Sequence, residues 1–166
     1  MICRKEKIAP NGPELSRIIS GVMQWGIWGA NLETEQISRL IADCCEMGVT
    51  SFDHADIYGR HTTEEAFGLA WKQTDIPREK IQLISKCGIK YPSRKKRDIK
   101  FKSYNTNASY IIQCVEDSLT NLQTEYLDVL LLHRPSPLME PDEVAPLRLG
   151  LIFSQSTFEP AWTGPA

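Results

Sequence analysis

The apolar residues of this chain form short clustered runs, which alternate with longer stretches where apolar residues recur three or four positions apart. Clustered runs indicate strands, and the wider spacing indicates helices. Residues 18–28, IISGVMQWGIW, predict a strand that leads into a loop. Three further strands are predicted at VTSFD (49–53), KIQLISK (80–86) and YLDVLLLH (126–133). The unbroken apolar stretch at 129–132 predicts burial on both faces, as in a parallel sheet.

Three helices are predicted between these strands, at residues 31–50, 62–73 and 108–123. The first has one apolar face, made by Ile37, Leu40, Ile41, Cys44 and Met47. Gly48 follows that face and suits a helix end, where a residue with positive φ is common. Pro77 prevents the second helix from continuing. The side chain of Asn107 is expected to cap the third helix.

Strands and helices therefore alternate, which predicts an α/β fold of parallel strands joined by right-handed helical crossovers. Two architectures remain open at this point: a doubly wound open sheet and a (β/α)8 barrel. The pattern does not separate them. The first strand-to-helix turn lacks G-x-G-x-x-G, and the chain has no G-x-x-x-x-G-K-[ST]. Both absences weaken the nucleotide-binding version of the open sheet.

The composition narrows the class of protein. A chain of 166 residues with 42% apolar and 24% charged residues is typical of one soluble globular domain. The net charge of −2 gives no general attraction to nucleic acid or to an anionic membrane. No apolar run reaches 18 residues, and residues 1–17 lack the apolar core of a secretory signal. We therefore expect a cytoplasmic protein with neither a nucleic-acid partner nor a membrane partner.

Neither the cysteines nor the histidines predict a metal site. The five cysteines are odd in number and contain no C-x-x-C, which favours reduced thiols over disulfides or zinc. His54 and His61 lie near Asp53 and Asp56, but Asp53 and His54 are neighbours on a strand and point to opposite faces. The basic segment 90–102 holds seven Lys or Arg residues and one Asp. It is interpreted as a solvated loop that shapes substrate access, since no nucleic-acid motif accompanies it.

Ionisable residues follow three successive predicted strands. Asp53 ends the second strand and Tyr58 comes five residues later, while Lys86 ends the third strand and His133 the fourth. In both candidate architectures the active site lies at the carboxyl ends of the strands. These four side chains are therefore expected to meet at one rim.

Together these residue types suit the reduction of a carbonyl group. A phenol has a pKa near 10 in water, and a neighbouring ammonium favours its ionised form. A carboxylate holds the ammonium, and an imidazole can donate a hydrogen bond to a carbonyl oxygen. Such a set gives a proton to a developing alkoxide. The second reactant is then most simply a hydride, which implies a nicotinamide cofactor.

The same residues resemble a known family. An Asp followed by Tyr five positions later, a Lys one strand on and a His after the next strand resemble the catalytic tetrad of the aldo-keto reductases. The stretches that carry this resemblance are FDHADIYG (52–59), LISKCGI (83–89) and LDVLLLHRPSPLM (127–139). The segments IAPNGPELSRIISGVMQWG (8–26), EEAFGLA (64–70) and VEDSLTNLQTEYLD (115–128) also resemble this family, most of all a bacterial branch of NADP-dependent oxidoreductases.

The resemblance implies a (β/α)8 barrel, an NADP(H) cofactor and a small aldehyde or ketone as substrate. It makes Tyr58 the general acid, with Lys86 favouring its deprotonation, Asp53 pairing with Lys86 and His133 orienting the carbonyl. Met23, Gln24 and Trp25 correspond to the segment that passes the nicotinamide, and Asp53 to the residue near its ribose. Trp25 and Trp28 fit two interpretations, as walls of the substrate pocket or as packing residues.

A full barrel needs more residues than this chain has, since about 200 is a practical minimum. Residues 1–145 are interpreted as the N-terminal half of an aldo-keto reductase barrel, about the first four βα units. Residues 146–166 resemble nothing in the family and are interpreted as an irregular tail after a truncation or frameshift. The outer strands would then be free edges, open to self-association. The alternative function is a non-catalytic half-barrel remnant or binding module.

Overall fold

The computed structural model describes residues 3–134 and residue 144. The predicted tail at 146–166 and its boundary at residue 145 lie outside the described residues. Four parallel strands form the main sheet in the order β3-β4-β5-β8. They are β3 (Ile19–Gly21), β4 (Ser51–Asp53), β5 (Gln82–Cys87) and β8 (Val129–Leu132). The predicted parallel α/β fold is thereby confirmed.

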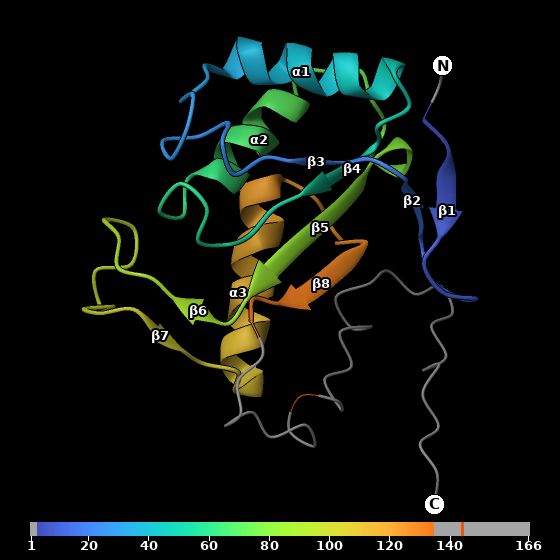
Figure 1. Cartoon of the computed structure of the whole chain (residues 1–166). Helices are drawn as coiled ribbons and strands as arrows, with labels where there is room; N and C mark the ends of the chain where they lie inside the picture. Colours follow the sequence, from blue (N-terminus) through green and yellow to red (C-terminus); the bar gives the residue numbers. More distant parts are fainter. Residues whose placement is uncertain (1–2, 135–143, 145–166) are drawn as a thin grey trace, which may run out of the picture.

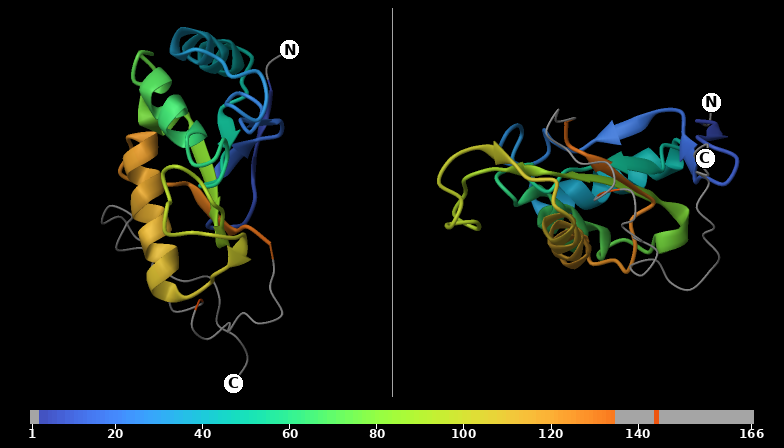
Figure 2. Two further views of the ribbon diagram at one scale, coloured as in Figure 1. Left: turned by 90° about the vertical axis from the view of Figure 1, so that its left-hand side faces the viewer. Right: turned by 90° about the horizontal axis from the view of Figure 1, so that it is seen from below.

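Three helices connect these strands: α1 (Thr34–Glu46), α2 (Thr63–Trp71) and α3 (Ala108–Leu122), and a short turn of helix, η1 (Arg78–Lys80), precedes β5. All three α-helices pack on one face of the sheet (Figures 1 and 2). On β8, Leu130 and Leu132 pack towards α3, whereas Leu131 between them remains 43% exposed. The prediction of burial on both faces of this strand is therefore wrong for the part of the chain that the structure describes. β8 and β3 are the two edges of its sheet, and their pairing with another chain stays a prediction.

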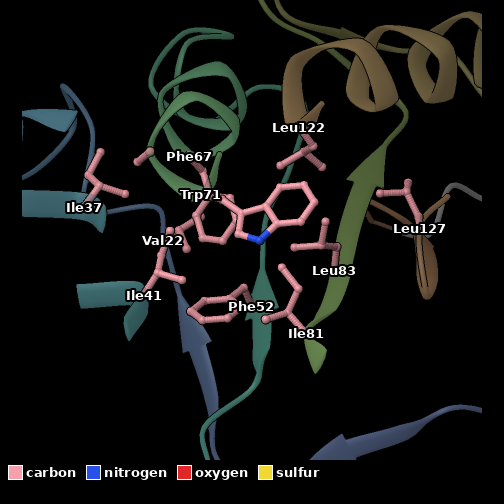
Figure 3. Close-up of a cluster of buried hydrophobic side chains, with 11 residues drawn as sticks. Val22, Ile37, Ile41, Phe52, Phe67, Trp71, Ile81, Leu83, Leu122 and Leu127 are labelled. Carbon is pink, nitrogen blue, oxygen red and sulfur yellow. The ribbon is translucent and has the colours of Figure 1, made fainter. Parts of the chain in front are cut away.

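The main core lies between the sheet and the helices (Figure 3). Phe52 on β4 and Leu83 on β5 project towards Phe67 and Trp71 on α2, and Leu122 of α3 closes the cluster. Phe52, Leu83 and Leu122 are fully buried. Each such side chain contributes about 1.5–3 kcal/mol through its removal from water. Side chains alternate between the two faces along a strand. Asp53 on β4 and Ile84 and Lys86 on β5 are therefore directed to the face of the sheet opposite the helices.

Two small antiparallel hairpins were not predicted from the sequence. β1 (Lys5–Lys7) pairs with β2 (Glu14–Ser16), and Ser16 binds the start of β4 through hydrogen bonds from the backbone of Thr50 and Ser51. β6 (Ile89–Lys90) pairs with β7 (Ser103–Tyr104), so the basic segment 90–102, interpreted as a loop, begins in one strand of a hairpin and leads to the other. These strands have two or three residues, too few for an apolar alternation to be visible.

The helix ends agree with the sequence at one point and differ at another. Gly48 has φ +82°, as expected of a residue that follows a helix. Asn107 is at the N-cap position of α3, but its side chain makes no capping hydrogen bond. The predicted side-chain cap is therefore wrong. The Asn107 backbone N–H instead donates to Asn105 Oδ1 at 3.0 Å, which fixes the approach to the helix.

The five cysteines form no disulfide. Within the described ranges, no helix combines the length and the apolar character needed to cross a membrane.

Candidate active site

The structure brings the four predicted residues to one edge of the sheet. Asp53 is the last residue of β4, Lys86 precedes the last residue of β5, and His133 follows β8 directly. Tyr58 lies on the segment between β4 and α2. The parallel register puts Asp53 opposite Ile84, two residues before Lys86 on the same face of β5. Short parallel strands of matched register therefore deliver three side chains to one rim.

Lys86 is the hub of this cluster. Its Nζ lies 2.6 Å from Asp53 Oδ1 and 2.7 Å from Oδ2, and it donates to the Tyr58 hydroxyl at 3.1 Å. A further bond runs from Nζ to the backbone carbonyl of His54 at 2.7 Å. The side chains of Lys86 and Asp53 are only 15% and 30% exposed, so this ion pair is poorly screened. The ammonium is thereby fixed against the phenol oxygen.

A tight turn after β4 holds Tyr58. Its N–H donates to the Ala55 carbonyl at 3.0 Å, and its own carbonyl accepts from the N–H groups of Thr62 and Thr63. Gly59 follows with φ +58°, and a side chain there would collide with the hydroxyl of Thr63. Only glycine meets both demands without strain. The turn therefore joins the start of α2 to the phenol that faces Lys86.

His133 faces the tyrosine from β8. Its backbone N–H donates to the Cys87 carbonyl at 2.7 Å, and its ring meets the Tyr58 ring edge-on with centroids 5.9 Å apart. Burial, together with the positive charge of Lys86, lowers the pKa of His133 below its ordinary value. The ring is therefore neutral at pH 7. Its Nδ1 is buried and has no partner, so the imidazole has hydrogen-bonding capacity to spare.

The role of His54 could not be predicted from its residue type or its place in the sequence. Its backbone carbonyl is a ligand of the Lys86 ammonium, and a backbone contact leaves no trace in residue type. The His54 ring points away from the cluster into the core, where it is fully buried and packs edge-on against Phe67. Neither ring nitrogen has a partner. Burial lowers the pKa of this imidazole to about 3, and the Lys86 charge adds to the effect.

The two tryptophans that had two interpretations differ in role. Trp25 packs into the core, with its ring 6.3 Å from both Phe52 and Phe67 between centroids. Trp28 instead contacts Tyr58 and Tyr91, with centroids 6.3 and 5.6 Å apart. Trp25 is thus a packing residue, and Trp28 forms an aromatic wall beside the tyrosine. Tyr91 belongs to this wall and was not singled out from the sequence.

The segment after β3 turns back on itself near the same edge of the sheet. Gln24 accepts a backbone bond from Ala30 at 2.7 Å, and Trp25 accepts one from Leu32 at 2.8 Å. The side chains of Met23 and Gln24 are exposed, Met23 by 37%. The Trp25 ring is in the core and the Trp25 N–H donates to the Val22 carbonyl at 2.9 Å, so this residue presents neither its ring nor its N–H to a cofactor.

Chemically, the site combines a phenol touched by an ammonium, a carboxylate that holds the ammonium, and a neutral imidazole. This set can donate a proton and hydrogen-bond an oxygen at the same place. No group of three His, Cys, Asp or Glu side chains among the described residues is arranged to hold a metal ion.

Comparison with known proteins gives a consistent match. The family model "Aldo/keto reductase family" matches residues 17–149. "Oxidoreductase YdhF" of Escherichia coli is 45% identical over 138 residues, which cover 83% of this chain and 45% of that protein. "Uncharacterized oxidoreductase YcsN" of Bacillus subtilis is 44% identical over 132 residues, which cover 80% of this chain and 43% of that protein. The chain thus spans less than half the length of these curated relatives.

Solved structures support the same architecture. The holo form of "aldo-keto reductase AKR11C1" from Bacillus halodurans superposes with a TM-score of 0.74 at 26% identity. The superposition covers 90% of this chain and 46% of that structure. The four strands and their helices therefore correspond to part of a (β/α)8 barrel, as the resemblance in sequence implied.

Proposed function

The chain belongs to the aldo/keto reductase family, and from this premise we propose that it carries out the NADPH-dependent reduction of an aldehyde or ketone. One observation carries the proposal: the Lys86 ammonium bridges the carboxylate of Asp53 and the hydroxyl of Tyr58 within 3.1 Å. This contact puts a positive charge against the phenol oxygen that would carry the negative charge once the proton has left. The composition and the unpaired thiols favour a cytoplasmic setting for the reaction.

In the proposed reaction Tyr58 is the general acid. The substrate carbonyl oxygen lies between the Tyr58 hydroxyl and the His133 ring. As a hydride reaches the carbonyl carbon, the oxygen gains negative charge and takes the proton of the phenol, so that an alcohol forms. The phenolate left behind is stabilised by the Lys86 ammonium. General acid catalysis of this kind contributes about 10²- to 10⁴-fold to the rate.

Asp53 and His133 support that proton transfer in different ways. Asp53 holds the Lys86 ammonium in place against the phenol oxygen. His133 is neutral, since burial lowers its pKa, and a neutral imidazole carries one N–H that can hydrogen-bond the substrate oxygen. A charged imidazolium beside Lys86 would repel the ammonium. The neutral ring therefore orients the substrate without disturbing Lys86.

NADP(H) fits the rim beside these residues. When bound, the reduced nicotinamide would supply the hydride. Met23 and Gln24 expose their side chains after β3, and the partly exposed Asp53 carboxylate is available to a ribose hydroxyl. Trp28 adds a flat aromatic surface next to Tyr58. These features suit the nicotinamide half of the cofactor.

The second candidate is a half barrel of residues 1–145 that binds ligands or partners without turnover. The observation in its favour is the open four-stranded sheet, whose edges β3 and β8 have no neighbouring strand within the described residues. Cofactor binding separates the two candidates, because catalysis requires the hydride donor to be held at the carbonyl carbon.

The test of the proposed function is a fluorescence titration of the purified chain with NADPH. We expect saturable quenching of tryptophan emission that is much reduced in Trp28→Phe, because Trp28 lies beside Tyr58 whereas Trp25 and Trp71, the other tryptophans of the described residues, are packed in the core. Adenosine 2′,5′-bisphosphate, which lacks the nicotinamide, serves as the control ligand and should leave the emission unchanged. Absence of saturable quenching at millimolar NADPH would contradict the enzyme proposal and favour the half barrel without turnover.

A further inference from the structure

A polar cavity of about 290 Å³ lies outside the tetrad, between α2, α3 and the basic loop that connects β6 and β7. It corresponds to the space of about ten water molecules in the liquid. The charged or titratable residues that line it include Asp56, His61, Glu64, Lys95, Lys96 and Asp117. None of Asp53, Tyr58, Lys86 and His133 is among them, so the proposed reaction leaves this cavity without a role.

Two buried carboxyl groups line the cavity, and one oxygen of each has no hydrogen-bond partner. Asp56 is 8% exposed and Glu64 is 2% exposed. Glu64 Oε1 accepts a bond from the Ser85 hydroxyl at 2.6 Å, but Glu64 Oε2 has no partner, and neither has Asp56 Oδ1. Buried polar atoms are nearly always paired, and an unpaired one is unfavourable. Both oxygens are therefore open to a ligand with N–H groups.

The cations around the cavity are already neutralised. Lys95 pairs with Glu65, and Lys96 Nζ lies 2.6 Å from Asp117 Oδ2. The His61 ring hydrogen-bonds the Tyr91 carbonyl at 3.0 Å, and burial lowers its pKa, so it carries no charge at pH 7. Neither lysine that lines the cavity is thus free to serve the two carboxyl groups.

The pKa values of Asp56 and Glu64 are consistent with the lack of a free cation beside them. Burial, together with nearby acidic groups, raises the pKa of Asp56 to about 9, and burial raises that of Glu64. A carboxyl group keeps its proton in this way when no positive charge compensates for lost hydration. A cation in the cavity would supply that charge.

We propose that this cavity binds a small organic cation with several N–H donors, such as a primary ammonium or a guanidinium group. Such a group displaces the protons that the two carboxyl groups hold in its absence, and its N–H groups then donate to Asp56 Oδ1 and Glu64 Oε2 at once. The three acids in the lining disfavour an anion, and no group of three metal-ligating side chains exists in the described part of the chain. The site is separate from the proposed reduction and does not depend on it.

The test uses n-butylammonium as the probe and amide chemical shifts of the ¹⁵N-labelled chain as the readout. We expect saturable shifts at the amides of Asp56, Glu64 and Cys114, which lie on the β4–α2 segment, on α2 and on α3. Tetramethylammonium has the same carbon and nitrogen atoms and the same charge but no N–H donor. At equal ionic strength it should produce no saturable shift.

Two variants identify the residues responsible. Asp56→Asn and Glu64→Gln keep the shape of each side chain and remove its capacity for charge, and each should weaken binding about tenfold or more. Glu65→Gln is the matched control, since Glu65 lies beside Glu64 on α2 but pairs with Lys95 at the surface, and its affinity should equal that of the wild type. Equal shifts with both cations, no saturation with n-butylammonium, or unchanged affinity in both Asp56→Asn and Glu64→Gln would overturn the proposal.

Discussion

Replacement of Tyr58 by Phe should lower the rate of carbonyl reduction by about 10²- to 10⁴-fold, while the affinity for NADPH stays the same. The substitution removes the hydroxyl that receives the Lys86 hydrogen bond at 3.1 Å. It keeps the ring that contacts Trp28 and His133, so the walls of the site are preserved. The measurement is a single-turnover rate with bound NADPH and excess aldehyde, together with a fluorescence titration of the cofactor.

Tyr91→Phe is the matched control for this prediction. Tyr91 lies against Trp28 in the same aromatic wall, and its link to His61 uses the backbone carbonyl. The variant should therefore retain a rate close to that of the wild type. If Tyr58→Phe reduces the aldehyde as fast as the wild type, Tyr58 is not the proton donor, and the proposed mechanism is wrong.

The second large effect concerns His54 and the stability of the fold. The pKa of this buried imidazole is about 3 in the folded chain, against about 6.5 when unfolded. Below about pH 6.5 the His54 imidazole is therefore protonated in the unfolded chain but neutral in the folded chain. The free energy of unfolding decreases as the pH falls from about 6.5 towards 3. The loss amounts to about 1.4 kcal/mol per pH unit, or about 3 kcal/mol at about pH 4.

His54→Leu should abolish this contribution. Asp56 titrates in the opposite sense, because its raised pKa favours the folded state as the pH falls, so the wild-type profile alone is not diagnostic. The diagnostic quantity is the difference in free energy of unfolding between wild type and variant, from urea denaturation at about pH 7 and about pH 4. This difference should move by about 3 kcal/mol in favour of the variant.

Leu69→Ala provides the control for the His54 experiment. Leu69 is 49% exposed on α2, so its effect on stability should be small and the same at both pH values. Parallel stability profiles for the wild type and His54→Leu would show that the buried imidazole does not resist protonation.

Much of the fold could be predicted because its main elements bury one face. The spacing of Ile37 and Ile41 indicated α1, and both residues are buried in the structure. The apolar runs around Phe52, Leu83 and Leu130 indicated three of the four parallel strands. The hairpins β1–β2 and β6–β7 escaped detection, because each of their strands has two or three residues with no more than one apolar residue among them. The exposure of Leu131 could not be predicted either, since it depends on which strands are present beyond β8.

Only the part of the candidate site that consists of side chains at strand ends could be predicted from the sequence. Asp53, Lys86 and His133 could be grouped because parallel strands end at one edge. The contact of Lys86 with a backbone carbonyl could not, since it depends on the path of the turn at His54. The sequence likewise does not show that the Trp25 ring packs in the core while the Trp28 ring lies beside Tyr58, because this depends on the direction of side chains in a loop. The burial of Asp56 in a separate cavity could not be predicted either, because it depends on how α3 and the basic loop pack around it.

Hydride transfer is tested most directly with NADPH that carries deuterium at both hydrogen positions of carbon 4 of the nicotinamide. The wild-type chain is incubated with the labelled cofactor and benzaldehyde, and the alcohol is examined by mass spectrometry. We expect benzyl alcohol with deuterium on the former carbonyl carbon. Tyr58→Phe should form this product far more slowly than the wild type. Unlabelled alcohol, or no alcohol from a chain that binds NADPH, would contradict the proposed reduction.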